Sequence, residues 1–407
     1  MTEIDLYENN KRTYIRLLIS RNLARFTNMA FSIYFMWEIV YIYHSVFLVS
    51  LIPGFSLLGY LIIAIPEGVI IDRYNRNKIY IIINAFMVFS YLILIKDSLY
   101  SIYIVDLISS TIIWVISDDF RGIEKQIIPP EKMEHVQSMD MLSSGLFMLA
   151  GIILGGVFIF IGYNYLTLFL VSVSIIELLL SIKNTTKKLH ITDNKNAFKF
   201  KSTVKITASI LPFLLLGLLL NGMFIALDVF ASGLIHIIMH APSYYYTLFV
   251  AGYPAGMLIG GVISMNPRVN AYHGRKNSMA LYIFISGIIF ILIAINRMPV
   301  LDGVLTFIIG VFLAFINILL ESKLINGIPD SIMGKFNSLA TMFSISSSPV
   351  MAFAFGYLSE FVYFPYILLF AGIVVAMSSL SVKYVMNSFE RNIKNIEIDF
   401  PELINGQ

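Results

Sequence analysis

The sequence Gly68-Val-Ile-Ile-Asp72-Arg73-Tyr-Asn-Arg76-Asn-Lys78 decides the fold of this chain. It stands between two apolar runs, 46–65 and 79–95, each close to the ~20 residues with which an α-helix crosses a bilayer. A short, charged turn between two such runs predicts a pair of membrane helices. Glycine lets helices approach closely, and an acid fixed beside basic residues can hold one helix end against its neighbours.

The composition agrees with a membrane protein of many spans. Of 407 residues, 58% are hydrophobic and 13% are charged, whereas a soluble domain carries about 25% charged residues. The chain has no cysteine, which excludes disulfides, thiol nucleophiles and iron–sulfur sites. The polar N-terminal segment lacks the pattern of a cleaved signal peptide, so we expect the first span to direct insertion.

Twelve apolar runs predict an all-α membrane protein with twelve transmembrane helices. The runs are too long for barrel strands and lack their alternation. Six precede and six follow a stretch rich in lysine and asparagine, at 15–41, 46–71, 78–96, 99–120, 136–161, 163–183, and 207–235, 243–266, 278–296, 299–321, 336–360 and 364–386.

The distribution of lysine and arginine predicts the orientation. With an even number of spans both termini lie on one side, and that side holds all but four of the 28 Lys and Arg residues. Lys96 and Arg297 lie on the opposite side, and Arg21 and Arg25 lie within the first span. Because positive charge favours the cytoplasmic side, both termini are predicted to be cytoplasmic.

The chain is predicted to consist of two pseudo-symmetric six-helix bundles. Residues 1–183 form the N-terminal half, 184–206 a basic cytoplasmic linker, and 207–407 the C-terminal half with a short cytoplasmic tail. Arg76 and Arg275 are separated by 199 residues, as are Pro130 and Pro329. A weak repeat of this kind is typical of transporters built from two related halves.

The opening stretch resembles the signature of the major facilitator superfamily, G-x-x-x-D-R-x-x-R, found between the second and third helices. Gly68, Asp72, Arg73 and Arg76 occupy the matching positions, and Lys78 follows them. The resemblance implies a cytoplasmic gate in which Asp72 contacts charges on neighbouring helices, Arg121 among them, and stabilises the outward-open state. The alternative is a hairpin whose arginines only mark the cytoplasmic side.

Three further segments, 20–28, 121–131 and 323–336, resemble the drug, macrolide and siderophore exporter branch of that superfamily. Two positions depart from its pattern: Thr27-Asn28 replaces a Gly-Asp pair, and Gly151-Ile152 replaces a Gly-Pro pair. The glycines of span five, Gly151, Gly155 and Gly156, resemble the antiporter motif of this branch. Plain helix packing explains the same glycines.

Polar residues within spans are costly and are the candidates for a substrate or proton site. Arg21 and Arg25 share one face of helix one, and either could instead extend to the interface. The carboxyl groups among the candidates could instead lie at the interface or pair with lysines. The complete candidate set is Arg21, Arg25, Asn28, Asp106, Asn221 and Asp228.

The sequence thus predicts a secondary active transporter working by alternating access, with proton-coupled export of a hydrophobic or amphipathic compound as the leading mode. An importer or uniporter of the same fold and a non-transporting membrane sensor are the alternatives. No ATP-binding loop or catalytic motif is present, so we expect no enzyme activity and no cofactor. His236 and His240 have the i, i+4 spacing of a metal site, but an interfacial position explains them better, and no metal is predicted.

The expected partners are a small-molecule substrate, protons and the lipid bilayer, without nucleic acid. The expected state is a monomer in the plasma membrane.

Overall fold

A computed structural model describes residues 3–73, 76–128, 130–182, 210–265, 276–327 and 339–399. Side chains are described for these residues except at several helix ends, namely 3–10, 64–73, 76–77, 118–119, 121–127, 130–135, 138, 276, 321–327 and 393–399. The predicted linker, 184–206, lies outside the described residues.

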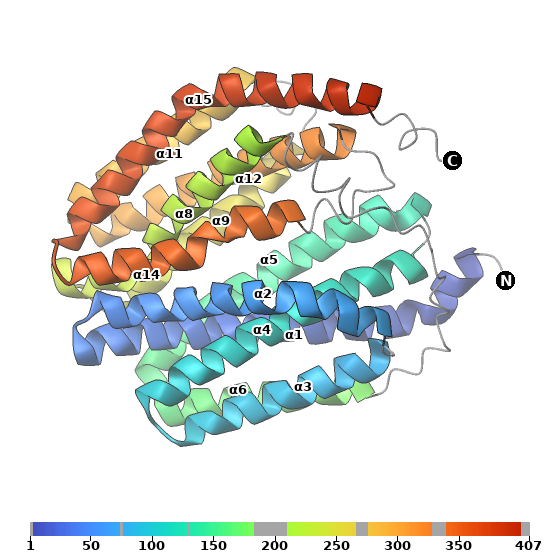
Figure 1. The fold of residues 1–407 in the computed structure, drawn as a ribbon. Coiled ribbons are helices and arrows are strands. Elements are labelled where there is room, and N and C mark those ends of the chain that lie inside the picture. The colour runs from blue at the N-terminus through green and yellow to red at the C-terminus, as the bar shows by residue number, and fades with distance from the viewer. Residues whose placement is uncertain are drawn as a thin grey trace. The chain divides into compact units, whose positions relative to one another are not determined.

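Twelve α-helices make up the described chain, which contains no strand, so the all-helical prediction is confirmed (Figure 1). The first six are α1 (Glu3–Tyr43), α2 (Val46–Arg73), α3 (Arg76–Leu92), α4 (Leu99–Ile127), α5 (Pro130–Ile161) and α6 (Tyr163–Ile182). The second six are α8 (Leu211–Gly233), α9 (Ser243–Ser264), α11 (Lys276–Ile295), α12 (Pro299–Gly327), α14 (Ser347–Ser359) and α15 (Phe364–Asp399). A 3₁₀ turn (Ile93–Ile95) follows α3, and a π-helix (Leu234–Ile238) follows α8.

The chain divides into two compact units. The first contains Met1–Ile191 together with Ala241–Thr247, and the second contains Thr192–His240 and Leu248–Gln407. Each unit therefore holds one set of six helices, apart from the first turn of α9, which belongs to the first unit.

Eleven of the helical segments in the described chain are long and apolar enough to cross a membrane. The exception is α1, whose central turns carry Arg21, Asn22, Arg25 and Asn28. Three of these four side chains are buried, and Arg25 is partly exposed. Burial in protein explains how a helix of this polarity can take part in a membrane bundle.

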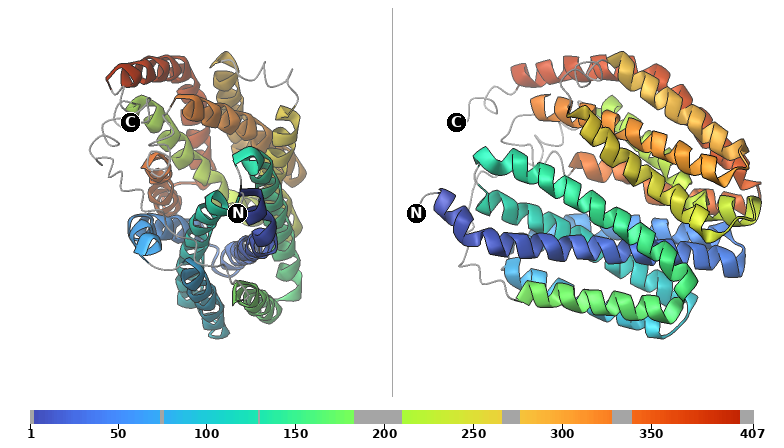
Figure 2. Two further views of the ribbon diagram at one scale, coloured as in Figure 1. Left: turned by 90° about the vertical axis from the view of Figure 1, so that its right-hand side faces the viewer. Right: turned by 180° about the vertical axis from the view of Figure 1, so that it is seen from behind.

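In the first unit, α1 packs against α5, α6, α4 and α2, and α3 packs against α6 and α4. Figure 2 shows α5 crossing α1, and it shows α6 beside α3. Glycines of α5 allow this approach: a Cβ on Gly151 would lie 2.5 Å from the Phe26 carbonyl oxygen of α1, and one on Gly155 would lie 2.8 Å from the Ala30 oxygen. Helix α1 is thus the central element of this unit.

In the second unit, α11 packs along α15, and α8 packs against α14 and α15. Helix α11 also contacts α12. A Cβ on Gly287 of α11 would lie 2.4 Å from the Ala376 nitrogen of α15, which shows how closely these two helices approach.

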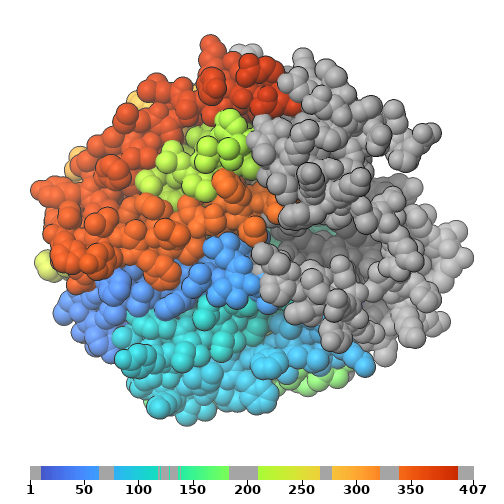
Figure 3. Space-filling view, in the orientation of Figure 1, coloured from blue at the N-terminus to red at the C-terminus, as the bar shows by residue number. Residues whose placement is uncertain are grey.

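Large apolar side chains remain exposed on both units. On α3 and α4 they include Phe86, Phe89 and Tyr100, and on α14 and α15 they include Tyr357 and Leu380. Figure 3 shows α3 and α4 at the surface of the first unit, and α14 and α15, with α8 between them, at the surface of the second. Such surfaces suit contact with lipid, where apolar side chains need no cover.

Candidate functional site

The signature stretch lies at the junction of α2 and α3. Helix α2 ends at Arg73 and α3 begins at Arg76, so the two helices predicted on either side of this stretch are present. The side chains of Gly68, Asp72, Arg73, Arg76 and Arg121 lie outside the described residues. Lys78 is described, and its side chain is exposed. The gate therefore stays a prediction.

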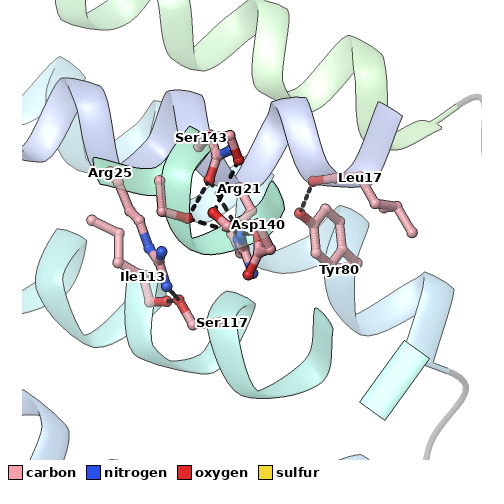
Figure 4. Close-up of polar contacts among 10 residues, drawn as sticks. Leu17, Arg21, Arg25, Tyr80, Ile113, Ser117, Asp140 and Ser143 are labelled. Carbon is pink, nitrogen blue, oxygen red and sulfur yellow. Dashed lines mark hydrogen bonds and ion pairs between the residues drawn. The ribbon is translucent and has the colours of Figure 1, made fainter. Parts of the chain in front are cut away.

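Arg21 of α1 forms an ion pair with Asp140 of α5 (Figure 4). The arginine is 2% exposed and the aspartate 19%. The same guanidinium nitrogen donates to Ser144 Oγ at 3.1 Å, and the guanidinium carbon lies 4.2 Å from the centre of the Phe120 ring. The planar guanidinium group of Arg21 thus forms an ion pair and a cation–π contact at the same time.

Asn22 extends this contact between α1 and α5. Its amide nitrogen donates to Ser143 Oγ at 3.0 Å, and its amide oxygen accepts from Ser144 Oγ at 3.1 Å. We call these five residues, Arg21, Asn22, Asp140, Ser143 and Ser144, the Arg21 cluster. Arg21, which the sequence analysis names as a candidate site residue, is therefore paired with Asp140 inside its own unit.

Arg25 lies one turn further along α1 and points to α4. It donates to Ser117 Oγ at 3.0 Å (Figure 4), and its side chain is only partly buried. Since i and i+4 residues share a helix face, Arg21 and Arg25 continue one line of positive charge, but they bind different helices.

Asn28 and Asp106 lie in one polar chain between α1, α2 and α4. Asn28 donates to Ser109 Oγ at 3.4 Å, and Ser109 Oγ donates to the Asp106 carbonyl oxygen at 3.3 Å. The Asp106 carboxylate accepts from Ser56 Oγ of α2 at 2.9 Å. Asp106 is fully buried, so the structure places this predicted acid inside the first unit.

Glu177 of α6 is a second fully buried acid in the same unit. Thr27 Oγ1 of α1 donates to its carboxylate at 3.4 Å, and Ser20 Oγ donates to its backbone oxygen at 3.3 Å. An acid within an apolar span is rare, and this marks Glu177 in the sequence. Only the three-dimensional packing shows that its side chain points inward toward α1.

Asn221 and Asp228 lie on the exposed side of α8, a helix whose side chains are otherwise mostly buried. They are seven residues apart, which is close to two helical turns, so they share one face. Asn221 donates to the Gly217 carbonyl oxygen of its own helix at 3.0 Å. Tyr253 of α9 lies near enough to Asp228 to interact with it electrostatically. We call Asn221 and Asp228 the α8 polar face.

The described residues contain no group of three or more His, Asp or Glu side chains that could hold a metal ion. His236 lies within the π-helix after α8, and His240 lies exposed just beyond it.

Comparison with known proteins places this arrangement in a family. The family model of the Major Facilitator Superfamily matches residues 17–351. The chain belongs to the major facilitator superfamily. The match runs from α1 into α14 and includes both units. No sequence of a curated protein matches the chain significantly.

Several solved structures of transporters have a similar fold. The nucleoside transporter NupG superposes with a TM-score of 0.73 at 11% identity, covering 92% of this chain and 99% of that one. A D-xylose-proton symporter gives 0.68 at 12% identity, with 91% and 96% covered. A POT family transporter in complex with 5-aminolevulinic acid gives 0.73 at 12% identity, with 93% and 96% covered. At these identities the likeness shows the fold alone.

Membership in the major facilitator superfamily gives the polar groups a context of solute transport. The candidates of α1 and α4 are buried or hydrogen-bonded within the first unit, whereas those of α8 are exposed. The helix-packing glycines Gly151 and Gly155 face α1, and Gly156 faces Thr247 at the start of α9. The polar side chains within these helices are therefore the candidates for contact with a transported solute.

Proposed function

We propose that this superfamily member is a secondary active transporter that moves a small molecule by alternating access and couples this movement to protons. The observation that carries the proposal is the α8 polar face. Asp228 is exposed in the middle of a membrane-spanning segment, Leu211–Ile238. A charged side chain is costly against lipid and is found facing protein interiors or aqueous paths, and this supports a position of Asp228 on a solute path.

The chemistry of this face suits exchange between a proton and a substrate. The Asp228 carboxylate can accept a proton or a hydrogen bond from a substrate, and Asn221 offers both a donor and an acceptor on the same face. If proton and substrate compete for Asp228, each release requires the other to bind. Such competition couples two opposite fluxes.

Export of a hydrophobic or amphipathic compound is the first candidate direction, because segments 20–28, 121–131 and 323–336 resemble the exporter branch. Proton symport is the second, favoured by the similarity of fold to a D-xylose-proton symporter. Antiport and symport use the same groups in this proposal and differ in whether proton and substrate bind to Asp228 alternately or together.

Purified protein in liposomes with a trapped pH dye tests the proposal. A concentration gradient of each compound is imposed in turn, using lipophilic cations, macrolides, siderophore-like compounds, nucleosides and pentoses. Proton movement opposite to the compound identifies antiport, and movement in the same direction identifies symport. We expect Asp228→Asn to abolish this signal and Asp97→Asn, a change at an exposed acid between α3 and α4, to retain it.

The proposal fails if radiolabelled compounds exchange normally while none moves protons, since the protein is then a uniporter or is coupled to another ion. It also fails if Asp228→Asn transports like the unaltered protein, because the α8 polar face then has no part in coupling.

A further inference from the structure

Among the described side chains of the first unit, Asp106 and Glu177 are buried acids with no described cation beside them. Asp106 of α4 and Glu177 of α6 both have 0% exposure. One oxygen of each carboxyl accepts a hydrogen bond, from Ser56 for Asp106 and from Thr27 for Glu177. The second oxygen of each, Asp106 Oδ2 and Glu177 Oε2, is buried and has no hydrogen-bond partner.

Tyr91 of α3 links the surroundings of these two acids. Its side chain is fully buried, and its hydroxyl group forms no hydrogen bond. It lies beside Thr27, which bonds Glu177, and beside Ser109, which bonds the Asp106 backbone. Three unpartnered polar groups from three helices therefore share one part of the bundle.

The described groups that face this region carry no positive charge. Helix α1 contributes Thr27 and Asn28, and α2 contributes Ser56. The nearest arginines of α1 are directed elsewhere: Arg21 to Asp140, and Arg25 to Ser117. Ser117 lies eleven residues beyond Asp106 on α4, about 16 Å along the helix axis. Neither acid has a basic partner among the residues whose side chains are described.

Burial without a cation favours the protonated form of each acid. An isolated ionised carboxylate is very costly in a low-dielectric interior, whereas a protonated carboxyl group is much less so and also gains an O–H donor. That donor can satisfy an otherwise unpartnered neighbour. Buried water makes about three hydrogen bonds to such groups, so water beside Tyr91 would satisfy the remaining oxygens.

We propose that Asp106 and Glu177 each bind a proton and, joined through Tyr91 and buried water, form a proton-binding site inside the first unit. This site is in the opposite unit from Asp228. Its protonation does not depend on the proposed transport function, but its role in coupling rests on that function. Coupling would then use one site in each unit. The α8 polar face would bind both substrate and proton, and the internal site would bind protons alone.

Infrared spectroscopy of the purified protein in liposomes tests protonation directly, because protonated and ionised carboxyl groups absorb differently. At neutral pH we expect a carbonyl band of protonated carboxyl groups. The band should lose part of its intensity in Asp106→Asn and in Glu177→Gln and stay unchanged in Asp97→Asn. Both substitutions keep the size of the neutral acid, and unaltered thermal unfolding confirms that each variant is folded.

Tyr91→Phe tests the link between the acids. We expect the band of both carboxyl groups to shift, because a hydrogen-bonding neighbour is lost. An unshifted band removes Tyr91 from the site. Absence of the band in the unaltered protein, with only ionised carboxylate absorption, overturns the whole proposal. Disappearance of the band when sodium replaces choline in the buffer also overturns it, since the site then binds a metal cation.

A flux measurement tests the coupling role with any compound that moves protons in the unaltered protein. We expect Asp106→Asn and Glu177→Gln to retain exchange of the radiolabelled compound and lose proton movement. Unchanged proton movement in both variants, despite the lost infrared intensity, refutes the coupling role. If the infrared band is present and no compound moves protons, the proposed function fails while the internal site stands.

Discussion

The guanidinium group of Arg21 in α1 and the carboxylate of Asp140 in α5 form an ion pair inside the first unit. The pair joins residues 119 positions apart in the chain, at the contact where Gly151 and Gly155 also bring the two helices together. The ion pair and the close packing therefore both hold α1 against α5. Substitutions at Arg21 and Asp140 remove the first, and substitutions at Gly151 and Gly155 disturb the second.

Arg21→Ala should strongly destabilise the protein. Removing one partner of a buried pair leaves the other charge uncompensated, which costs about 3–5 kcal/mol. The partial exposure of Asp140 places the expected loss toward the lower end of this range. Thermal unfolding in detergent measures the effect, and Lys96→Ala, which removes an exposed charge after α3, is the control.

The double variant Arg21→Met with Asp140→Leu separates charge from packing. Replacing both members of a buried pair by apolar residues is often neutral or stabilising. We therefore expect the double variant to unfold at a higher temperature than Arg21→Ala. A double variant as unstable as Arg21→Ala would show that the neighbouring Asn22 and serine contacts, and not the charge pair, hold α1 to α5.

The glycines of α5 give a second test of the same helix contact. A Cβ on Gly151 would meet the Phe26 carbonyl oxygen at 2.5 Å and Met29 Cβ at 2.9 Å. Because helix backbones cannot move aside without disturbing their other contacts, Gly151→Ala should cost ~1–3 kcal/mol. Gly155→Ala should behave in the same way.

Gly261→Ala is the matched control in α9. A Cβ there has no heavy atom within 4 Å, so the substitution should stabilise the helix by roughly 0.5–1 kcal/mol. Thermal unfolding of the three variants compares them directly. If Gly151→Ala and Gly261→Ala change stability in the same direction, close packing of α5 on α1 is not what Gly151 provides.

The helices follow from the sequence, but most side-chain positions do not. Apolar runs of membrane length predict twelve helices because no other structure satisfies the backbone in lipid. The inward face of each helix is harder to predict, since lipid-facing and core-facing side chains are both apolar. Asp106 and Glu177 therefore could not be assigned to the interior, nor Asp228 to an exposed face, from periodicity alone.

The pairing of Arg21 with Asp140 illustrates the same limit. The sequence shows two charges near the ends of two spans, and an arginine so placed has several possible partners. Choosing Asp140 requires knowing that α1 crosses α5 and at which turn. The glycines of α5 do indicate a close helix contact, but glycine spacing does not identify the partner helix.

The turn between α11 and α12 offers a test in the second unit. Asn296 donates to the Asp302 carboxylate at 2.6 Å and to the Met298 carbonyl oxygen at 2.8 Å, and its own oxygen accepts from the Met298 amide at 3.2 Å. Asp302 is fully buried, and its other carboxylate oxygen has no partner. Asn296→Ala would leave both oxygens of this acid without a donor.

We expect Asn296→Ala to destabilise the protein by about 1–3 kcal/mol, the cost of a buried polar group left unpaired. Asn277→Ala, at an exposed position near the other end of α11, should change stability little. Thermal unfolding compares the two. Equal stability of the variants would mean that the loop between α11 and α12 does not depend on the contact with Asp302.

The signature acid gives the prediction that bears most directly on alternating access. By the family resemblance, Asp72 at the end of α2 stabilises one of two conformations. Losing such a contact changes a conformational equilibrium by ~1–3 kcal/mol, a factor of roughly 5–150 in population.

Asp72→Asn should therefore lower substrate flux by about tenfold or more while leaving thermal unfolding nearly unchanged, because the helix ends remain intact. Lys96→Ala, at an exposed position after α3 and outside the signature, should keep its flux. Flux in proteoliposomes and accessibility of a cysteine introduced at the exposed position Leu215 of α8 measure the two effects. Reduced flux with unaltered accessibility would place Asp72 in binding or folding and not in the conformational equilibrium.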